Sequence, residues 1–327
     1  MSVLVVATGG TISSHFDGTD WQGLSGAALV AELGDLSDLA PCGVDVVDAA
    51  TGPSSNLGFD DILAIARRVA TALDDGATGV VVLHGTDTLE LTAFTTQLLL
   101  GTTAHRRPVV LTGSMRVHSH PSPDGPRNLR DAIAVAASDT AVGREVLVCL
   151  EGALHAADRV VKRSAASVDA FDSAPLAPVG RVVDGRITFT ALAEARTAAR
   201  GFVTDVPLVT CYPGITGDAV AAAIGSSPGA VVEAFGDLNM PFVAWSAVHG
   251  ACANGSLVAV ASRPFTPTRS SEGLELSGAV GAGGLTAQKA RLAVMAALGT
   301  GDTRPDAIAF LHQYALRYDA GERRTSS

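Results

Sequence analysis

The sequence predicts an α/β protein with two parts: a larger N-terminal domain built on a wound, flavodoxin-like parallel sheet, and a smaller C-terminal α/β domain. Three observations support this fold class. Short apolar, strand-like runs alternate with amphipathic helical segments along the chain. Hydrophobic residues make up 47% of the 327 residues and charged residues 17%, so the chain can bury a large core. Aromatic residues make up only 5%, which leaves Ala, Val, Leu and Gly to pack the helices tightly on the sheet.

The first half of the chain contains five strand-like runs separated by helical segments. In the clearest helix, Ile62, Ile65, Val69 and Leu73 recur at helical spacing behind Asp60, a candidate N-cap. Glycines at 76 and 101 are expected to end this helix and the next one. Strands are expected at residues 3–7, 44–48, 79–84, 108–112 and 145–150, and helices at 61–75, 90–100 and from near 128.

The second half begins after a hairpin and a polar, alanine-rich segment. Residues 181–192 predict a hairpin that turns at Asp184-Gly185. We expect domains of 1–195 and 206–327 joined by a linker at about 196–205. In the second domain, strands are expected at 206–212, 229–235 and 256–262, and helices at 286–298 and 304–317, the last with Thr303 as N-cap and Pro305 in its first turn.

Charge and cysteine usage exclude several classes of function. The chain has 33 acidic and 23 basic residues, and no stripe of lysine or arginine, so nucleic acid is not expected as a partner. The four cysteines are far apart and lack zinc spacing, so no zinc site is expected. No signal peptide precedes the first strand, and no apolar run approaches the ~18 residues of a membrane helix. A cytoplasmic protein without a membrane partner is therefore expected.

The first candidate motif, Thr8-Gly9-Gly10-Thr11, directly follows the first strand. Paired glycines let a backbone turn sharply and approach a ligand closely. The spacing is neither that of a dinucleotide fingerprint nor that of a P-loop, and an ordinary turn is the alternative. The glycine-bearing segment 13–26 follows at once and is interpreted as a mobile lid, with an ordinary surface loop as the alternative.

The second candidate motif is His84-Gly85-Thr86-Asp87-Thr88, which follows another buried strand. Open α/β sheets bind ligands beyond the carboxyl ends of their strands, where a hydroxyl can serve as an acyl-transfer nucleophile. Asp87 could accept a hydrogen bond from a substrate ammonium. The alternative is that Thr86 or Asp87 only caps the helix that starts near Glu90. His84 is expected to be a packed or hydrogen-bonded residue at the strand end.

Other candidate groups carry weaker signals. A lone loop lysine such as Lys162 is usually a solvated charge, so it gains a catalytic role only if the fold brings other site residues beside it. His118 and His120 flank Ser119 but have no evident third metal ligand, so surface histidines are expected.

Together, these stretches resemble the bacterial-type L-asparaginase/glutaminase family over nearly the whole chain. The resemblance implies a threonine nucleophile, no cofactor, and active sites that lie between the subunits of an intimate dimer, so a homodimer or homotetramer is expected. The residues that carry it are 7–12 (Ala-Thr-Gly-Gly-Thr-Ile), 84–90 (His-Gly-Thr-Asp-Thr-Leu-Glu), 112–116 (Thr-Gly-Ser-Met-Arg), 124–129 (Asp-Gly-Pro-Arg-Asn-Leu), 159–162 (Arg-Val-Val-Lys) and 288–291 (Gln-Lys-Ala-Arg).

The family pattern also implies roles for individual residues. Thr11 matches the nucleophile that attacks the side-chain amide. Thr86, Asp87 and Lys162 match a second catalytic set of hydroxyl, carboxylate and amine. Ser54 matches the serine that holds the α-carboxylate of the substrate, and Asp87 also matches the ligand of the α-amino group. The remaining implied substrate contacts are Gly10, Ser55, Gly85, Ser114 beside the amide, and Asn239, which a neighbouring subunit's second domain would lend.

Two departures from the family pattern leave details open. The family's loop tyrosine is missing, because the chain's only tyrosines are Tyr212, Tyr314 and Tyr318. His15, Phe16 and Trp21 stand in the loop instead, so either Lys162 acts through Thr86, or the loop supplies another group, or activity is weak. Ser55 replaces the family's glutamine, which leaves the preference between asparagine and glutamine open.

The expected reaction is therefore hydrolysis of L-asparagine to L-aspartate and ammonia through an acyl-enzyme. Glutaminase or mixed activity is the alternative within the class, because one methylene changes binding by only about 1–3 kcal/mol. A subunit of a tRNA-dependent amidotransferase would need an additional nucleic-acid-binding region, for which the chain has neither spare length nor a basic patch. A non-catalytic amino-acid sensor of the same fold is the alternative from another class.

Overall fold

The computed structural model describes residues 1–50, 52–190, 193–264 and 272–315. The chain divides into two compact units, Met1–Ala198 and Ala199–Ser327. The finer limits of 1–195 and 206–327, with a linker at 196–205, stay a prediction. Among the described residues, no helix is both long enough and apolar enough to cross a bilayer.

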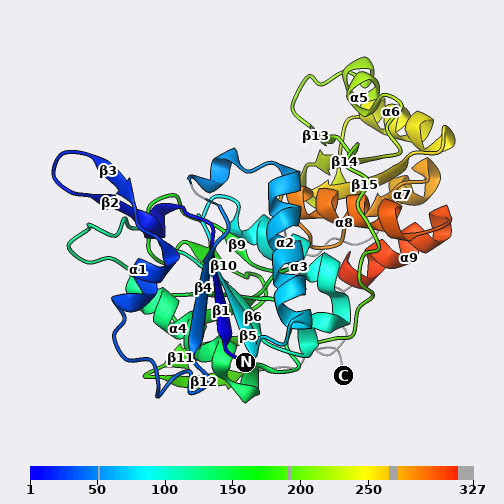
Figure 1. The fold of residues 1–327 in the computed structure, drawn as a ribbon. Helices are drawn as coiled ribbons and strands as arrows, with labels where there is room; N and C mark the ends of the chain where they lie inside the picture. Colours follow the sequence, from blue (N-terminus) through cyan, green and yellow to red (C-terminus); the bar gives the residue numbers. More distant parts are fainter. Residues whose placement is uncertain (51, 191–192, 265–271, 316–327) are drawn as a thin grey trace, which may run out of the picture. The chain divides into compact units, whose positions relative to one another are not determined.

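The first unit is built on an eight-stranded sheet in the order β12-β11-β8-β7-β6-β5-β1-β4 (Figure 1). The five strands from β4 to β7 run parallel, so the wound parallel sheet is confirmed. The other three pair antiparallel and extend the sheet at one edge. The strands are β1 Val3–Ala7, β4 Val44–Asp48, β5 Gly79–Leu83, β6 Val109–Thr112, β7 Leu147–Leu150, β8 Ala153–Ala156, β11 Gly180–Val183 and β12 Arg186–Phe189.

Helices cover both faces of this sheet, which is why its central strands are apolar on both sides. Consecutive residues of β1 point to opposite faces: Val5 packs in the core that α1 and α4 share, and Val6 packs in the core that α2 and α3 share. Cys149 in β7 is buried. The helices are α1 Gly26–Ala31, α2 Phe59–Asp74, α3 Leu89–Leu100 and α4 Gly125–Ala137.

The strand order places a topological switch point between β1 and β5. The chain runs from β1 to β4 on one side, and then returns to β5 on the other side of β1. Ala7 lies opposite Leu83 in this parallel pair, so the two strands end at the same level. Ligands of doubly wound sheets bind at such a crevice. The loops that carry the two threonine motifs therefore lie side by side.

The predicted N-cap of α2 is wrong. The helix begins at Phe59 and its N-cap is Gly58, so Asp60 lies within the first turn. The Gly58 N–H donates to the Asp61 carboxylate at 2.8 Å. Asp61, at the third helical position, thus accepts from the N–H of the N-cap, which is the backward half of a capping box.

The predicted start of α4 near residue 128 is also wrong, because the helix begins at Gly125 with a proline in its first turn. Asp124 precedes it, but its side chain makes no capping bond. The two carboxylate oxygens instead accept from the backbone N–H groups of Met115 and Arg116, at 2.8 and 2.9 Å. The aspartate thus holds the loop after β6.

The first unit contains two β-hairpins, one at the edge of the eight-stranded sheet and one outside it. The β11–β12 hairpin turns at Asp184 (φ 48°) and Gly185 (φ 75°), as predicted, although residues 191 and 192 lie outside the described part. The segment 13–26, interpreted as a mobile lid, contains an antiparallel ribbon of β2 (Ser14–Phe16) and β3 (Trp21–Gly23), and its movement stays a prediction. The rings of Phe16 and Trp21 contact each other across the ribbon in a tilted arrangement, with their centroids 5.4 Å apart.

The second unit contains a parallel sheet in the order β13-β14-β15-β16, as expected for the smaller α/β domain. Helices α5 and α6 pack against one face of this sheet through a shared apolar core. Helix α8 packs on β14 and β15. Residues 316–317 of the predicted last helix lie outside the described part. The elements are β13 Leu208–Thr210, α5 Gly217–Ile224, β14 Gly229–Ala234, α6 Phe242–Ala253, β15 Leu257–Ser262, α7 Glu272–Ser277, β16 Val280–Gly281, α8 Ala287–Thr300 and α9 Arg304–Ala315.

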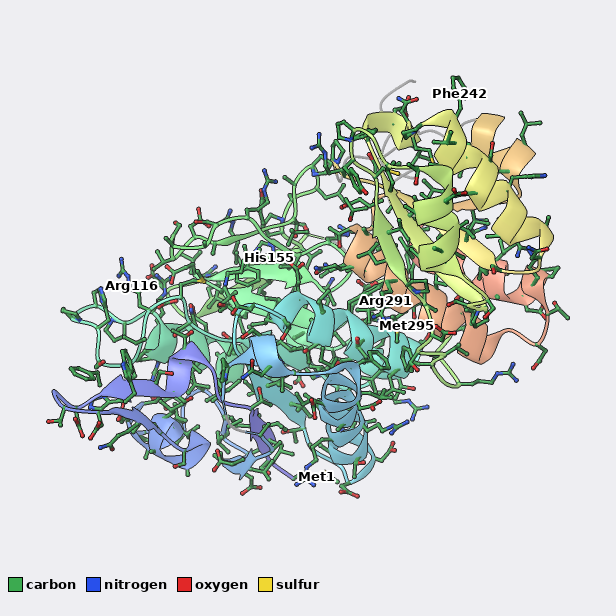
Figure 2. All side chains as sticks on the ribbon, turned by 90° about the horizontal axis from the view of Figure 1, so that it is seen from above. Met1, Arg116, His155, Phe242, Arg291 and Met295 are labelled. Atoms are coloured by element: carbon green, nitrogen blue, oxygen red, sulfur yellow. The ribbon has the colours of Figure 1, made fainter. Side chains whose placement is uncertain are left out.

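Helix α8 also binds the extended segment that opens the second unit (Figure 2). The Val203 N–H donates to the Met295 carbonyl at 2.9 Å, and the Arg291 guanidinium Nε donates to the Val206 carbonyl at 2.6 Å. These bonds replace the sheet or helix partners that an irregular backbone lacks.

Within the first unit, Arg196 forms a buried ion pair. Its guanidinium lies 3.0 Å from the Asp158 carboxylate and 3.9 Å from that of Glu145, and the Arg196 and Asp158 side chains are at most 1% exposed. The Arg196 carbonyl accepts from the Thr102 hydroxyl at 2.7 Å. The ion pairs of the Arg196 side chain and the hydrogen bond to its carbonyl therefore attach the end of the first unit to its interior.

We expect Arg196→Met to lower the free energy of unfolding by about 3–5 kcal/mol, because it removes the cation from two buried carboxylates. Arg200→Met is the matched control, since the Arg200–Asp302 pair is exposed and such pairs contribute about 1 kcal/mol or less. Urea denaturation of the three proteins measures the difference. Equal midpoints for the two variants would contradict a stabilising role for the buried pair.

Candidate active site

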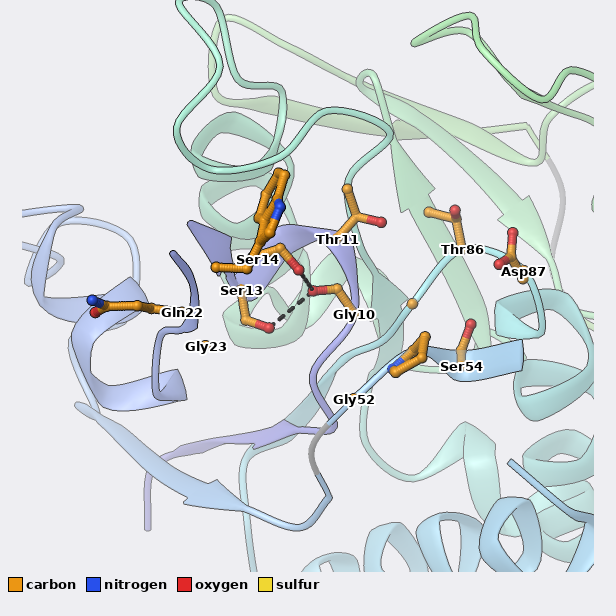
Figure 3. A pocket seen from close by; sticks show the side chains of 13 residues that line it. Gly10, Thr11, Ser13, Ser14, Gln22, Gly23, Gly52, Ser54, Thr86 and Asp87 are labelled. Carbon is orange, nitrogen blue, oxygen red and sulfur yellow. Dashed lines mark hydrogen bonds between the residues drawn. The ribbon is translucent and has the colours of Figure 1, made fainter. Parts of the chain in front are cut away.

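A cavity of about 390 Å³ lies at the switch point, in the first unit (Figure 3). The loop after β1, the loop after β5, the segment before α2 and the strand β3 all contribute to its wall. Six of the predicted site residues are among those that line it. The lining residues are Gly10, Thr11, Ser13, Ser14, Trp21, Gln22, Gly23, Gly52, Pro53, Ser54, Gly85, Thr86 and Asp87.

Close backbone contacts explain the glycines of both motifs. Gly10 has φ +90°, and a Cβ atom on it would lie 2.4 Å from the Cα of Gly85. A Cβ on Gly85 would in turn lie 2.7 Å from the Cβ of Ser54. Side chains at these positions would separate the three segments, so glycine allows the backbones after β1 and β5 to touch.

Thr11 opens a single 3-10 turn, Thr11–Ser13, immediately after the Gly10 contact. Its hydroxyl points across the cavity toward the side where Thr86 and Asp87 lie (Figure 3). No other described side chain or backbone group forms a hydrogen bond with this hydroxyl. The oxygen is therefore accessible to a molecule in the cavity.

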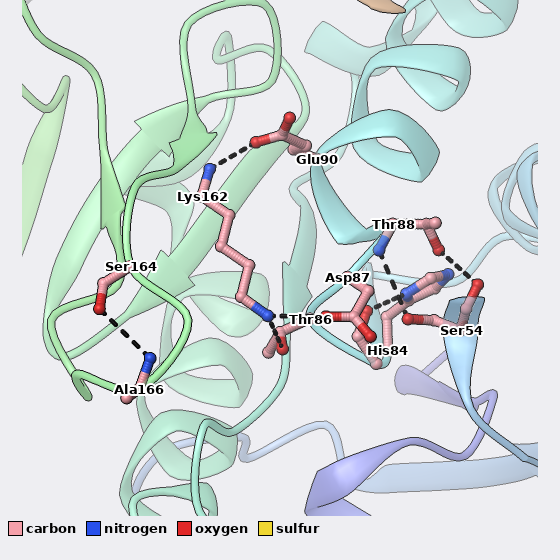
Figure 4. Close-up of polar contacts among 10 residues, drawn as sticks. Ser54, His84, Thr86, Asp87, Thr88, Glu90, Lys162, Ser164 and Ala166 are labelled. Carbon is pink, nitrogen blue, oxygen red and sulfur yellow. Dashed lines mark hydrogen bonds and ion pairs between the residues drawn. The ribbon is translucent and has the colours of Figure 1, made fainter.

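Lys162, which is 75 residues from Asp87 in the chain, completes the second group (Figure 4). Its Nζ donates to the Thr86 hydroxyl oxygen at 2.9 Å and to the Asp87 carboxylate at 2.8 Å. The Lys162 side chain is 19% exposed and that of Asp87 is 60% exposed. The Lys162 backbone N–H donates to the Glu90 carboxylate at 2.6 Å, which fixes the short strand β9 (Val161–Lys162) against the start of α3.

The alternative that Thr86 or Asp87 caps α3 is wrong. The helix begins at Leu89, its N-cap is Thr88, and no side chain makes the capping bond. The Thr88 hydroxyl instead donates to the Ser54 carbonyl at 2.9 Å, which holds the Ser54 segment at the cavity wall. Thr86 and Asp87 are thus not engaged in helix capping.

His84 is the hydrogen-bonded strand-end residue that the sequence predicts. It is fully buried, with Nδ1 2.8 Å from the Gly85 carbonyl oxygen and Nε2 2.9 Å from the Thr92 hydroxyl. Burial lowers the pKa of His84 to about 4, and the bond to Gly85 opposes this shift only in part. The ring is therefore neutral at pH 7, with Nδ1–H donating to Gly85 and Nε2 accepting from Thr92.

Four predicted residues do not line the cavity: Lys162, which contacts Thr86 and Asp87 instead, and Ser55, Ser114 and Asn239. Ser55 is exposed on the 3-10 turn after Ser54. Ser114 is buried, and its hydroxyl donates to the Arg116 carbonyl at 2.6 Å. Asn239 belongs to the second unit, where it is exposed and its amide donates to the Gly236 carbonyl at 2.9 Å.

Ser13 and Ser14 also line the cavity, although neither was predicted at the site. Both hydroxyls point at the Gly10 carbonyl, at 2.9 and 3.1 Å. Both serines lie in the segment 13–26 that was interpreted as a lid, but hydroxyl residues are common in loops, so no signal in the sequence distinguished them from their neighbours. Trp21 lines the cavity from β3, which places one of the three candidate loop residues at the site.

Of the two histidines expected at the surface, His118 is largely covered and only His120 is exposed. Its ring is 14% exposed and lies 3.0 Å from the Glu32 carboxylate, whereas His120 is exposed. Within the described ranges, no three side chains of His, Cys, Asp or Glu are grouped closely enough to hold a metal ion.

Comparison with known proteins covers both units. Residues 2–194 match the family described as "Asparaginase, N-terminal", and residues 205–310 match the "Glutaminase/Asparaginase C-terminal domain". A probable L-asparaginase of Deinococcus radiodurans is 33% identical over 316 residues, which cover 92% of this chain and 94% of that protein. A glutaminase-asparaginase of Pseudomonas fluorescens biotype A is 32% identical over 71% of this chain and 67% of its own length. The crystal structure of a probable cytoplasmic L-asparaginase from Campylobacter jejuni superposes with a TM-score of 0.85 and 28% identity, covering 94% of this chain and 98% of that one.

The buried, neutral His84 predicts that acid destabilises the first unit in a defined range. The unfolded chain binds a proton at a pKa of 6.5 and the folded chain only at about 4, so stability is full above 6.5 and falls as the pH drops toward 4. The loss amounts to about 3 kcal/mol. His84→Gln should flatten the unfolding free energy over this range relative to wild type. Parallel pH profiles from urea titrations would contradict the assignment.

Proposed function

The chain belongs to the asparaginase family, which makes it an amide hydrolase by class, and we propose that it hydrolyses L-asparagine to L-aspartate and ammonia. One observation carries the proposal. The Thr11 hydroxyl faces the same cavity as Thr86 and Asp87, and Lys162 contacts both of these residues. A nucleophile on one side and a proton-transferring group on the other are what acyl transfer needs.

In the first step, Thr11 Oγ1 bonds to the amide carbon of the substrate and the carbon–nitrogen bond breaks. The Thr11 proton passes to Thr86 Oγ1, while the Thr86 hydroxyl gives its own proton to the departing nitrogen, so ammonia leaves. Lys162 Nζ donates to the same Thr86 oxygen at 2.9 Å, which leaves the Thr86 hydroxyl hydrogen free to face the cavity. This relay operates without the loop tyrosine that the sequence lacks.

In the second step, water adds to the acyl carbon of the Thr11 ester. The ester bond breaks, Thr11 Oγ1 regains one proton of the water, the other proton passes to solvent, and the product leaves with a carboxylate at its side chain. Thr86, held by Lys162, is placed to orient the attacking water. The Thr11 N–H is the proposed donor to the oxyanion in both steps; a single donor of this kind contributes about 3–4 kcal/mol in known enzymes.

Recognition of the amino-acid end of the substrate is assigned to Ser54 and Asp87. Asp87 is 60% exposed and its carboxylate can pair with an α-ammonium, while Ser54 is buried at the cavity wall with its backbone held by Thr88. Gly10 and Gly85 contribute backbone at the point of closest approach. Ser55 and Ser114 are given lesser roles, because neither lines the cavity.

The proposal includes a homodimer or homotetramer in which Asn239 of one copy completes the site of another. Asn239 is exposed on the second unit. Three residues further along, Phe242 is 91% exposed at the start of α6. Val243 beside it is 50% exposed, and aromatic residues are enriched at protein interfaces, which supports a partner surface here.

Thr11→Ala should reduce ammonia release from L-asparagine by about four orders of magnitude or more, because the attacking oxygen is gone. Binding of L-aspartate, measured by calorimetry, should persist. Thr71→Ala, at an exposed position of α2, is the matched control and should keep wild-type turnover. Undiminished turnover in the Thr11 variant would exclude it as the nucleophile.

Glutaminase or mixed activity is the second candidate, and the name of the Pseudomonas fluorescens relative supports keeping it. We expect kcat/KM for L-asparagine to exceed that for L-glutamine by about 10–200-fold, the range that one methylene can supply. Measuring ammonia release from both amides decides the question. A higher value for glutamine would reverse the assignment, and no release from either would favour a non-catalytic sensor.

A further inference from the structure

Three hydrogen-bond donors converge on the carbonyl oxygen of Gly10. The Ser13 N–H lies at 3.1 Å, the Ser13 hydroxyl at 2.9 Å and the Ser14 hydroxyl at 3.1 Å. Figure 3 shows both serine side chains turned toward this oxygen. A carbonyl has two lone pairs, and a buried one needs a single partner to be satisfied. The Ser13 N–H already meets that need, so the two hydroxyls go beyond it.

The carbonyl in question belongs to the peptide group between Gly10 and Thr11. In a trans peptide the C=O and the N–H point in opposite directions. The Gly10 oxygen faces the two serines, and in Figure 3 Thr86 and Asp87 lie on the other side of Gly10. The Thr11 N–H is therefore directed away from the serines and toward the side where those catalytic candidates lie.

Close packing against Gly85 fixes the position of the Gly10–Thr11 peptide. Gly10 touches Gly85 so closely that a Cβ atom would lie 2.4 Å from the Gly85 Cα. The plane of the Gly10–Thr11 peptide could still rotate, and the hydrogen bonds from the Ser13 and Ser14 hydroxyls restrict that rotation. They also polarise the peptide, because hydrogen bonds to a carbonyl strengthen the donor at the other end of the same amide.

We propose that Ser13 and Ser14 are positioning residues that orient and polarise the Gly10–Thr11 peptide as an oxyanion-binding donor. The inference rests on the proposed amide hydrolysis, and concerns how the negative charge on the substrate oxygen is stabilised. The Thr11 N–H donates to that oxygen as Thr11 Oγ1 bonds to the carbon. The serines act through the peptide, and neither is hydrogen-bonded to Thr86, Asp87 or Lys162.

The expected size of the effect follows from this indirect action. Removing one oxyanion donor outright reduces kcat by about 10²–10³-fold. Losing one hydroxyl leaves the donor in place but less well aligned, so each should lower kcat by about tenfold. The loss should appear in kcat rather than in KM, because the interaction develops only as charge builds on the oxygen.

The closing experiment compares Ser14→Thr with Ser14→Val. The two variants have side chains of similar size and shape and differ in the hydroxyl, and β-branched residues suit the start of β2. We expect Ser14→Thr to retain most of kcat for L-asparagine and Ser14→Val to lose about tenfold. KM and the affinity for L-aspartate should differ by less than twofold between them. Ser13→Ala, checked by its melting temperature, should lose a similar factor in kcat.

The possible outcomes distinguish a failure of the proposed serine role from a failure of the proposed amide hydrolysis. Wild-type turnover with equal kcat in Ser14→Thr and Ser14→Val would overturn the role of the serines and leave the proposed function intact. A loss confined to KM would also overturn it, since it would place Ser14 in substrate binding. A wild-type protein that releases no ammonia from either amide would overturn the proposed function and this inference with it.

Discussion

The backbone contact between Gly10 and Gly85 is the constraint on which the site depends. It exists because β1 and β5 are parallel neighbours that end at the same level, with Ala7 opposite Leu83. A Cβ atom on Gly10 would lie 2.4 Å from the Gly85 Cα, so any other residue would separate the two loops. The residues that follow in each loop then face one cavity.

Around this contact, buried polar groups outside the cavity support the residues that line it. His84 bonds the Gly85 carbonyl and the Thr92 hydroxyl, and Glu90 accepts from the Lys162 backbone. Neither His84 nor Glu90 lines the cavity. Networks of this kind are costly when partly satisfied and rigid when complete, so they restrict the orientation of the groups they support. The proposed catalytic hydroxyls and amine thus occupy a frame set by residues that need not touch substrate.

Local sequence patterns predicted which segments form helices better than they predicted the residues at which the helices begin. The apolar spacing of α2 and the glycine after α3 located both helices, but the side chain next to a helix start can be engaged elsewhere. Asp124 looks like an ordinary cap, yet it accepts from the backbones of Met115 and Arg116. At α2, the side chain that makes a capping contact is that of Asp61, which accepts from the Gly58 N–H, and not that of Asp60. Such choices depend on which backbone groups a neighbouring loop leaves unsatisfied.

By itself, the sequence determined the α/β class, the two glycine–threonine turns at strand ends and membership in the asparaginase family. The tertiary structure alone decided which distant groups meet. It brings Lys162 to Thr86 and Asp87 across about 75 residues, turns Ser13 and Ser14 onto the Gly10 carbonyl, and leaves Ser114 outside the cavity. The physical reason is that periodicity and turn chemistry encode local burial. Contacts across the chain depend instead on strand order and register, which are set by packing of the whole sheet.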